Sequence, residues 1–227
     1  KYRPYIKIPS PTIVRPIKNQ YDLVYKRIGD RSLKLDLFSP KSAVPIKHPG
    51  IILIHGGGWS SGDKSQMHMI ARELASKDYI CYTLEYRLSP EAPYPAALLD
   101  LKDAIAWIKQ HGSDQGLDTS KIAALGTSAG GQLASLLGTT NGKETFAQQR
   151  VSKPALSTVQ AVINIDGVLA FHHPESAEGK SASIWLLGNY KENPANWTEA
   201  SALSNVSAKA VPTLFLNSSN ARFHAGR

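Results

Sequence analysis

The pattern of hydrophobic and polar positions changes at about residue 20. Residues 1–20 contain four prolines, which interrupt any helix, so we expect an extended, Pro-rich N-terminal arm on the surface. Residues 21–28 and 33–38 then alternate apolar with polar side chains on either side of a Gly-Asp-Arg turn, which is typical of a β-hairpin. We therefore expect one folded domain over residues 21–227.

From residue 50 onwards, short apolar runs alternate with helical patterns. The expected strands are 50–54, 79–86, 121–125, 159–165 and 211–216, and the expected helices are 65–77, 95–110 and 129–137. This alternation favours an α/β fold whose mostly parallel central sheet carries helices on both faces. Residues 169–209, between the last two strands, form a long segment with a short helical pattern at 182–187. We expect a small, cap-like insertion that faces the substrate.

Composition excludes some classes of protein. The chain has 42% hydrophobic and 19% charged residues, as in ordinary globular proteins. No apolar run approaches the roughly 20 residues of a membrane-spanning helix. With Cys81 as its one cysteine, the chain has no internal disulfide. The net charge of +8 suits an acidic polysaccharide, but the basic residues are scattered, which argues against a nucleic-acid partner.

The strongest chemical signal is Gly126-Thr127-Ser128-Ala129-Gly130, between an expected strand and an expected helix. A G-x-S-x-G segment in this position makes a sharp turn that lifts the serine hydroxyl clear of the sheet. The following helix N-terminus adds positive potential where an oxyanion would form. We therefore predict that Ser128 is a catalytic nucleophile rather than a structural serine in a glycine-rich turn.

A second signal, His55-Gly56-Gly57-Gly58-Trp59, directly follows the first buried strand. Bare backbone N–H groups stabilise the negative oxygen of a tetrahedral intermediate. We expect an oxyanion hole made of the N–H groups of Gly57, Gly58 and Ala129. A phosphate-binding loop is the rival interpretation, but the spacing lacks the motifs of such loops. His55 is expected to brace the loop rather than to act as a base.

Both motifs, in this order, resemble α/β-hydrolase esterases of the hormone-sensitive-lipase-like type, and the resemblance spans residues 50–217. The segments Tyr86–Glu91 and Tyr94–Ala97, with Asp100, match a further stretch of such esterases. Later segments (Trp185–Gly188, Trp197, Ala200-Ser201, Pro212–Ser219 and Arg222–Arg227) look like a bacterial branch of carbohydrate esterases that act on acetyl, feruloyl or similar esters. The resemblance implies an α/β-hydrolase fold, and it implies that Arg87 and Asp100 lock loops together.

A serine hydrolase of this type also needs an acid and a histidine base, which form a catalytic triad with the serine. Neither can be assigned with the same ease as Ser128. The family places the acid after the strand expected at 211–216 and the histidine after one further strand, which this sequence does not contain. We expect a missing C-terminal segment to supply both, so that the sheet lacks its last strand and helix and the chain alone is far less active than the full-length protein. Alternatively, Asp166 is the acid and His224, His172 or His173 is the base. A third alternative is an inactive hydrolase fold used for binding.

The expected reaction is hydrolysis of a carboxylic ester through an acyl-enzyme, on a small-molecule or carbohydrate ester. Trp59 and Trp185 are expected to form aromatic walls for the substrate, though each could equally pack in the core. No cluster of residues has metal-ligand spacing, so no metal or cofactor is expected. The main enzymatic rival is a small-metabolite amidase or formamidase. A secreted or periplasmic location is favoured over the cytoplasm, and nothing in the pattern indicates an oligomeric state.

Overall fold

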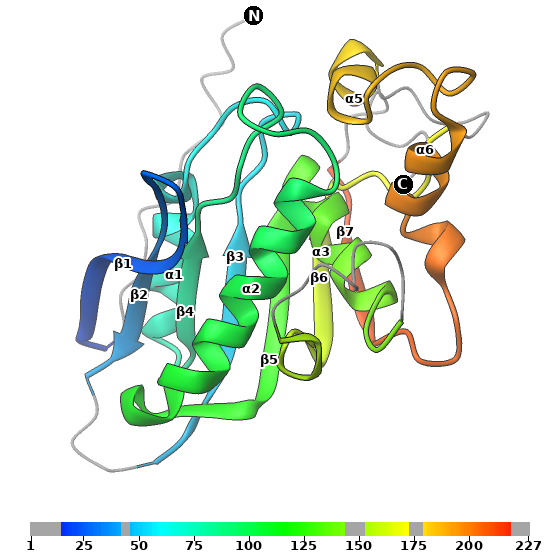
Figure 1. Cartoon of the computed structure of the whole chain (residues 1–227). Helices are drawn as coiled ribbons and strands as arrows, with labels where there is room; N and C mark the ends of the chain where they lie inside the picture. The colour runs from blue at the N-terminus through cyan, green and yellow to red at the C-terminus, as the bar shows by residue number, and fades with distance from the viewer. Residues whose placement is uncertain (1–14, 42–45, 144–152, 173–178, 219–227) are drawn as a thin grey trace, which may run out of the picture.

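A computed structural model describes residues 15–41, 46–143, 153–172 and 179–218. Its centre is a seven-stranded sheet in the order β1-β2-β4-β3-β5-β6-β7 (Figure 1). The strands are β1 (Ile17–Ile28), β2 (Arg31–Pro40), β3 (His48–Ile54), β4 (Ile80–Leu84), β5 (Leu117–Thr127), β6 (Ala161–Ile165) and β7 (Thr213–Leu216). Strands β4, β3, β5, β6 and β7 run parallel, whereas β1 and β2 form an antiparallel hairpin at one edge. The α/β-hydrolase type of sheet expected from the sequence is confirmed.

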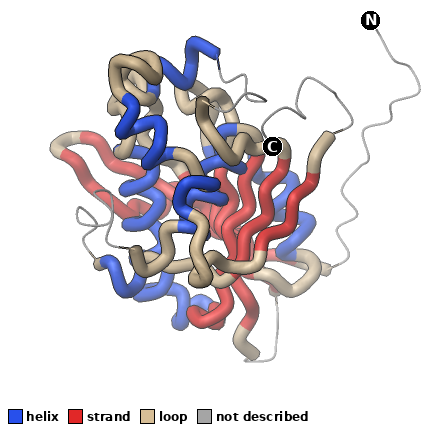
Figure 2. The backbone as a smooth tube through the Cα atoms, turned by 90° about the vertical axis from the view of Figure 1, so that its right-hand side faces the viewer, coloured by secondary structure: helices blue, strands red, loops and turns tan. Residues whose placement is uncertain are grey.

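Helices cover both faces of the sheet, as Figures 1 and 2 show. The main helices are α1 (His68–Ala75), α2 (Ala96–His111) and α3 (Ala129–Thr139). Alternate residues of β3 divide between two cores: Ile52 and Ile54 pack with α2 and α3, while Ile51 and Leu53 pack with α1. Because strand side chains alternate in direction, a continuous apolar run is required where both faces are buried.

Several boundaries differ from the expected ones. Residues 17–20, assigned to the N-terminal arm, already belong to the hairpin, where Ile17 pairs with Pro40. The rest of that arm, 1–14, lies outside the described residues. The helix expected at 65–77 is a 3-10 turn, η1 (Lys64–Met67), followed by the shorter α1. Strand β5 begins four residues before Lys121, because Leu117 and Asp118 pair with the first two residues of β3 ahead of a register shift.

The segment between β6 and β7 starts beyond the carboxyl end of β6, at the upper right of Figure 1, and then runs down the right side to the start of β7. It contains α5 (Gly179–Trp185), α6 (Pro194–Ala200) and the 3-10 turn η4 (Leu203–Asn205). The remaining 3-10 turns are η2 (Gly112–Gln115) and η3 (Pro154–Leu156). Strand β7 is the outermost strand of the described sheet, and its Leu214, Phe215 and Leu216 are exposed.

Candidate active site

Ser128 lies on a sharp turn between a strand and a helix. Strand β5 ends at Thr127 and α3 begins at Ala129. The backbone of Ser128 has φ 54° and ψ −118°, a strained conformation for a residue with a side chain. Its N–H donates to the Ile165 carbonyl at 2.8 Å, and the residue itself is exposed. The turn therefore presents a serine hydroxyl to solvent at the carboxyl end of the sheet.

Glycine is required at two positions around this turn for lack of space. A Cβ on Gly126 would lie 2.0 Å from the Gly130 carbonyl oxygen. A Cβ on Gly130 would lie 2.2 Å from the Ile54 carbonyl oxygen. In both cases the obstacle is backbone, which cannot move aside as a flexible side chain can. The glycines allow α3 to pack directly against β3 and β5.

The glycine loop after β3 lies against the Ser128 turn. A Cβ on Gly56 would be 2.9 Å from the Thr127 carbonyl oxygen and 3.3 Å from Ser128 Cβ. Only a bare backbone can approach so closely. The two motifs, which are about 70 residues apart in the sequence, therefore form one site.

Three backbone donors are available at this site. Within the described part of the chain, the N–H groups of Gly57, Gly58 and Ala129 make no hydrogen bond to another residue. The Gly57 carbonyl accepts from the N–H groups of Ser60 at 3.2 Å and Ser61 at 3.1 Å, which holds the loop in a tight turn. Gly57 and Gly58 are partly exposed and both have positive φ, 120° and 59°.

His55 is buried, and its ring contacts Tyr86 and Gly56. Its ring stacks on Tyr86 with the centroids 4.4 Å apart, and its Nδ1 lies 2.8 Å from the Gly56 carbonyl oxygen. The Tyr86 hydroxyl donates to the His55 carbonyl at 2.9 Å. Burial lowers the pKa of His55, so the neutral ring is favoured. These contacts brace the glycine loop.

Gln132 is a residue of the site that sequence reasoning missed. It is fully buried on α3, one turn after Ser128. Its Oε1 accepts from Trp59 Nε1 at 2.9 Å, and its Nε2 donates to the Ala200 carbonyl at 2.8 Å. A single amide thus connects the glycine loop, helix α3 and α6. A glutamine in a helix of mostly small and apolar residues was the signal that could have identified it.

The prediction that Trp59 and Trp185 form walls for a substrate is wrong. Their rings stack on each other with centroids 4.9 Å apart and planes 7° apart. Trp59 is 6% exposed and Trp185 is 0% exposed, so neither has a face left for a ligand. The alternative, packing in the core, is what the structure has, because α5 closes over the loop that carries Trp59.

Asp166 lies beside Ser128 in the sheet, and its contacts include the end of β7. It directly follows β6, next to Ile165, which accepts the hydrogen bond of Ser128. Its carboxylate Oδ1 accepts from the N–H of Ser218 at 2.7 Å, and its own N–H donates to the Leu216 carbonyl at 3.0 Å. Asp166 therefore ties the end of β7 to the end of β6, and a role as triad acid stays a prediction.

The histidines in the described ranges all contact groups other than Ser128. His172 is exposed and stacks on Tyr190 with centroids 3.6 Å apart. The other contacts are His48 with Asp78, His55 with Gly56, His68 with Asp36, and His111 with Trp107. His224 and His173, the other two base candidates, lie outside the described residues.

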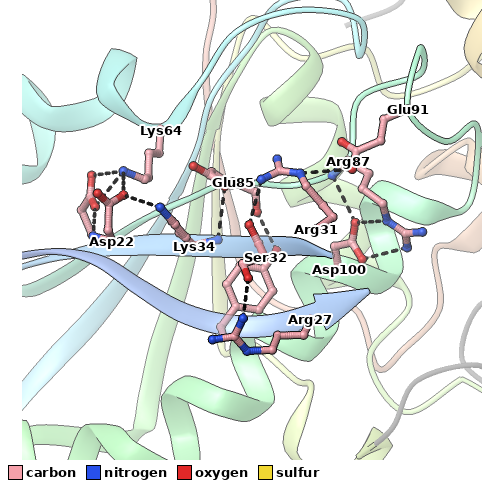
Figure 3. Close-up of polar contacts among 12 residues, drawn as sticks. Asp22, Arg27, Arg31, Ser32, Lys34, Lys64, Glu85, Arg87, Glu91 and Asp100 are labelled. Carbon is pink, nitrogen blue, oxygen red and sulfur yellow. Dashed lines mark hydrogen bonds and ion pairs between the residues drawn. The ribbon is translucent and has the colours of Figure 1, made fainter. Parts of the chain in front are cut away.

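Arg87 and Asp100 form a bidentate ion pair beside the site (Figure 3). Asp100 is fully buried and accepts from Arg87 Nε at 2.8 Å, Nη2 at 2.9 Å and backbone N–H at 3.1 Å. Lys26 of the hairpin donates to the same carboxylate at 2.8 Å. The hydrogen bonds to Asp100 raise the pKa of Arg87. The cluster joins the hairpin, the loop after β4 and α2.

Two further properties concern the described ranges as a whole. No group of three or more His, Cys, Asp or Glu side chains there could hold a metal ion. None of the helices in those ranges combines the length and apolar character needed to cross a membrane.

Comparison with known proteins finds similarity to one family model and to several esterases. The BD-FAE family model matches residues 35–222. A probable carboxylic ester hydrolase, LipM of Mycobacterium tuberculosis, is 32% identical over 94% of this chain and 52% of its own length. The crystal structure of esterase B from Lactobacillus rhamnosis has a TM-score of 0.77 at 24% identity, over 92% of this chain and 67% of that one. A truncated carbohydrate esterase from gut microbiota has a TM-score of 0.73 at 21% identity, over 93% and 79%. The chain spans about half the length of LipM.

Proposed function

The chain belongs to the BD-FAE family, and from that premise we propose that it is a serine carboxylic ester hydrolase that works through an acyl-enzyme. One observation carries the proposal: the exposed Ser128, on its strained turn, lies beside a loop whose N–H groups at Gly57 and Gly58 have no partner among the described residues. A nucleophile next to unengaged donors is the arrangement that acyl transfer requires.

In the proposed reaction, Ser128 Oγ attacks the carbonyl carbon of the ester while its proton passes to a general base. The carbonyl oxygen becomes an oxyanion, which the N–H groups of Gly57, Gly58 and Ala129 stabilise. The ester C–O bond then breaks, and the alcohol leaves with the proton. Water attacks the acyl-enzyme in the same way and restores the Ser128 hydroxyl. The exposed strained turn and the tightly held loop support these assignments.

We propose that the general base is a histidine outside the described residues, because those inside them have other partners. His224 and His173 stay candidates, together with any histidine of a longer polypeptide. Asp166 stays a candidate for the acid, since it directly follows Ile165, whose carbonyl accepts the hydrogen bond from the Ser128 N–H.

For the substrate, we propose an ester of a plant polysaccharide or of its oligosaccharides, with acetyl as the acyl group tested first. A structural neighbour described as a carbohydrate esterase supports this choice. The net charge of +8 supports acidic glycans in particular. Rates on acetylated pectin, acetyl xylan, p-nitrophenyl acetate and N-formylkynurenine test it. Fastest turnover of the formamide would replace the proposal by its amidase rival.

The nucleophile is tested by labelling the full-length protein with a fluorophosphonate and mapping the adduct by mass spectrometry. We expect one adduct, on Ser128, and none in Ser128→Ala. Ser113→Ala is the matched control, because Ser113 is exposed and lies near the start of β5, at the opposite end of that strand from Ser128. An unlabelled Ser128 in the folded full-length protein would favour a non-catalytic binding role instead.

A further inference from the structure

Helix α5 closes over the glycine loop, and buried aromatic residues hold it there. Ala182 and Trp185 of α5 are both fully buried. Trp185 stacks on Trp59, and its carbonyl accepts from the N–H of Tyr94 at 2.8 Å. Trp59 directly follows Gly58. The turn of α5 before Trp185 is therefore held next to the loop that offers the backbone donors.

On that face, Ser181 is the side chain nearest to Gly58. A Cβ built on Gly58 would lie 3.5 Å from Ser181 Oγ and 3.6 Å from Ser181 Cβ. Both residues are partly exposed, so solvent reaches the space around them. Among the described residues, Ser181 Oγ has no hydrogen-bond partner, although a hydroxyl can donate once and accept twice. A small, open, hydrogen-bonding side chain thus borders the proposed oxyanion hole.

We infer that Ser181 is a specificity-determining residue that hydrogen-bonds a hydroxyl group of the sugar in a carbohydrate ester bound at Ser128. The inference rests on the proposed function and adds to it a feature of the alcohol part of the substrate. The oxyanion hole binds the carbonyl oxygen, which every ester has. The Ser181 hydroxyl beside it would distinguish an ester of a sugar from an ester of a phenol. The sugar carries neighbouring hydroxyl groups that can bind Ser181, and the phenol does not.

The test compares two acetyl esters that differ only in the alcohol, acetylated xylo-oligosaccharide and p-nitrophenyl acetate, with the full-length protein. For Ser181→Ala we expect kcat/KM on the sugar ester to fall between about threefold and tenfold, the effect of one neutral hydrogen bond. We expect kcat/KM on p-nitrophenyl acetate to stay within twofold. Ser181→Thr keeps the hydroxyl and should restore most of the rate on the sugar ester.

Ser183→Ala is the matched control. Ser183 has the same side chain on the same helix, and two residues turn it by about 200° from Ser181. It should change neither rate. Equal losses on both esters, or no loss on either, would overturn the role of Ser181. If the protein hydrolyses p-nitrophenyl acetate but not the sugar ester, the role of Ser181 is overturned too, whereas the proposed ester hydrolysis is supported. No hydrolysis of any ester and no labelling of Ser128 would overturn the proposed function as well.

Discussion

Trp59 Nε1 donates a 2.9 Å hydrogen bond to Gln132 Oε1, and both side chains are buried. This contact joins the loop that offers the backbone donors to α3, the helix that begins directly after Ser128. The distance between Gly58 and Ser128 therefore depends on a polar pair inside the core as well as on backbone packing. It also explains why a glutamine occupies a buried position on α3.

Gln132→Leu should destabilise the protein, because it leaves Trp59 Nε1 and the Ala200 carbonyl without their partner. An unsatisfied buried polar group costs about 1–3 kcal/mol. Urea unfolding of Gln132→Leu, Trp59→Phe and the double variant measures the coupling between the two residues. We expect the double variant to lose less than the sum of the single ones, and strict additivity would mean that the contact has no energetic weight.

Gly57→Ala should lower kcat and also destabilise the protein, because its φ of 120° is strained for a residue with a side chain. Its Cβ would lie 2.1 Å from the Ser61 carbonyl oxygen, so the loop must shift and its donors move. Displacement of one oxyanion-hole donor costs about 10²–10³ in kcat. Esterase kinetics at saturating p-nitrophenyl acetate provide the measurement.

Gly29→Ala is the control for backbone conformation. Gly29 also has positive φ, 54°, but a Cβ there meets nothing within 4 Å. It should cost about 1–2 kcal/mol of stability, the strain of a left-handed residue, and leave kcat unchanged. Similar kcat values for Gly57→Ala and Gly29→Ala would argue against a role of the Gly57 N–H in the oxyanion hole.

Arg87→Met should be strongly destabilising, since it leaves the buried Asp100 carboxylate with Lys26 as its remaining cationic partner among the described residues. Breaking a buried ion pair costs about 3–5 kcal/mol. Arg31→Met is the matched control: Arg31 contacts Glu85 and Glu91 at the surface, with 45% of its side chain exposed (Figure 3). Its loss should cost less than about 1 kcal/mol. Thermal and urea unfolding compare the two, and equal losses would contradict the structure.

His55 should make stability depend on pH on the acidic side. Burial lowers its pKa below the ordinary value, so the unfolded chain takes up the proton at higher pH than the folded chain. The contribution of His55 to the free energy of unfolding is fully present above about pH 6.5, the ordinary histidine pKa. It is lost as the pH falls towards the folded pKa. Unfolding of the wild type and His55→Gln between pH 7.5 and 5 should show a smaller pH dependence for the variant; parallel curves would refute the assignment.

The sequence was a good guide to elements and motifs because these depend on neighbours along the chain. Apolar runs located the parallel strands, and glycines on both sides of Ser128 located the turn. Boundaries were less certain. The first strand begins at Ile17 because pairing with Pro40, a partner more than 20 residues away, extends it.

By itself, the sequence determined the order of strands and helices, the Ser128 turn and the triple-glycine loop, because local backbone geometry requires these residue types. Only the tertiary structure decided what the aromatic and polar side chains do. Trp59 and Trp185 are 126 residues apart, and either could have faced solvent until α5 packed over the loop. The same packing brings Ser181 next to Gly58, and the fold of α3 brings Gln132 to Trp59. Such contacts depend on how distant elements meet, which no local pattern encodes.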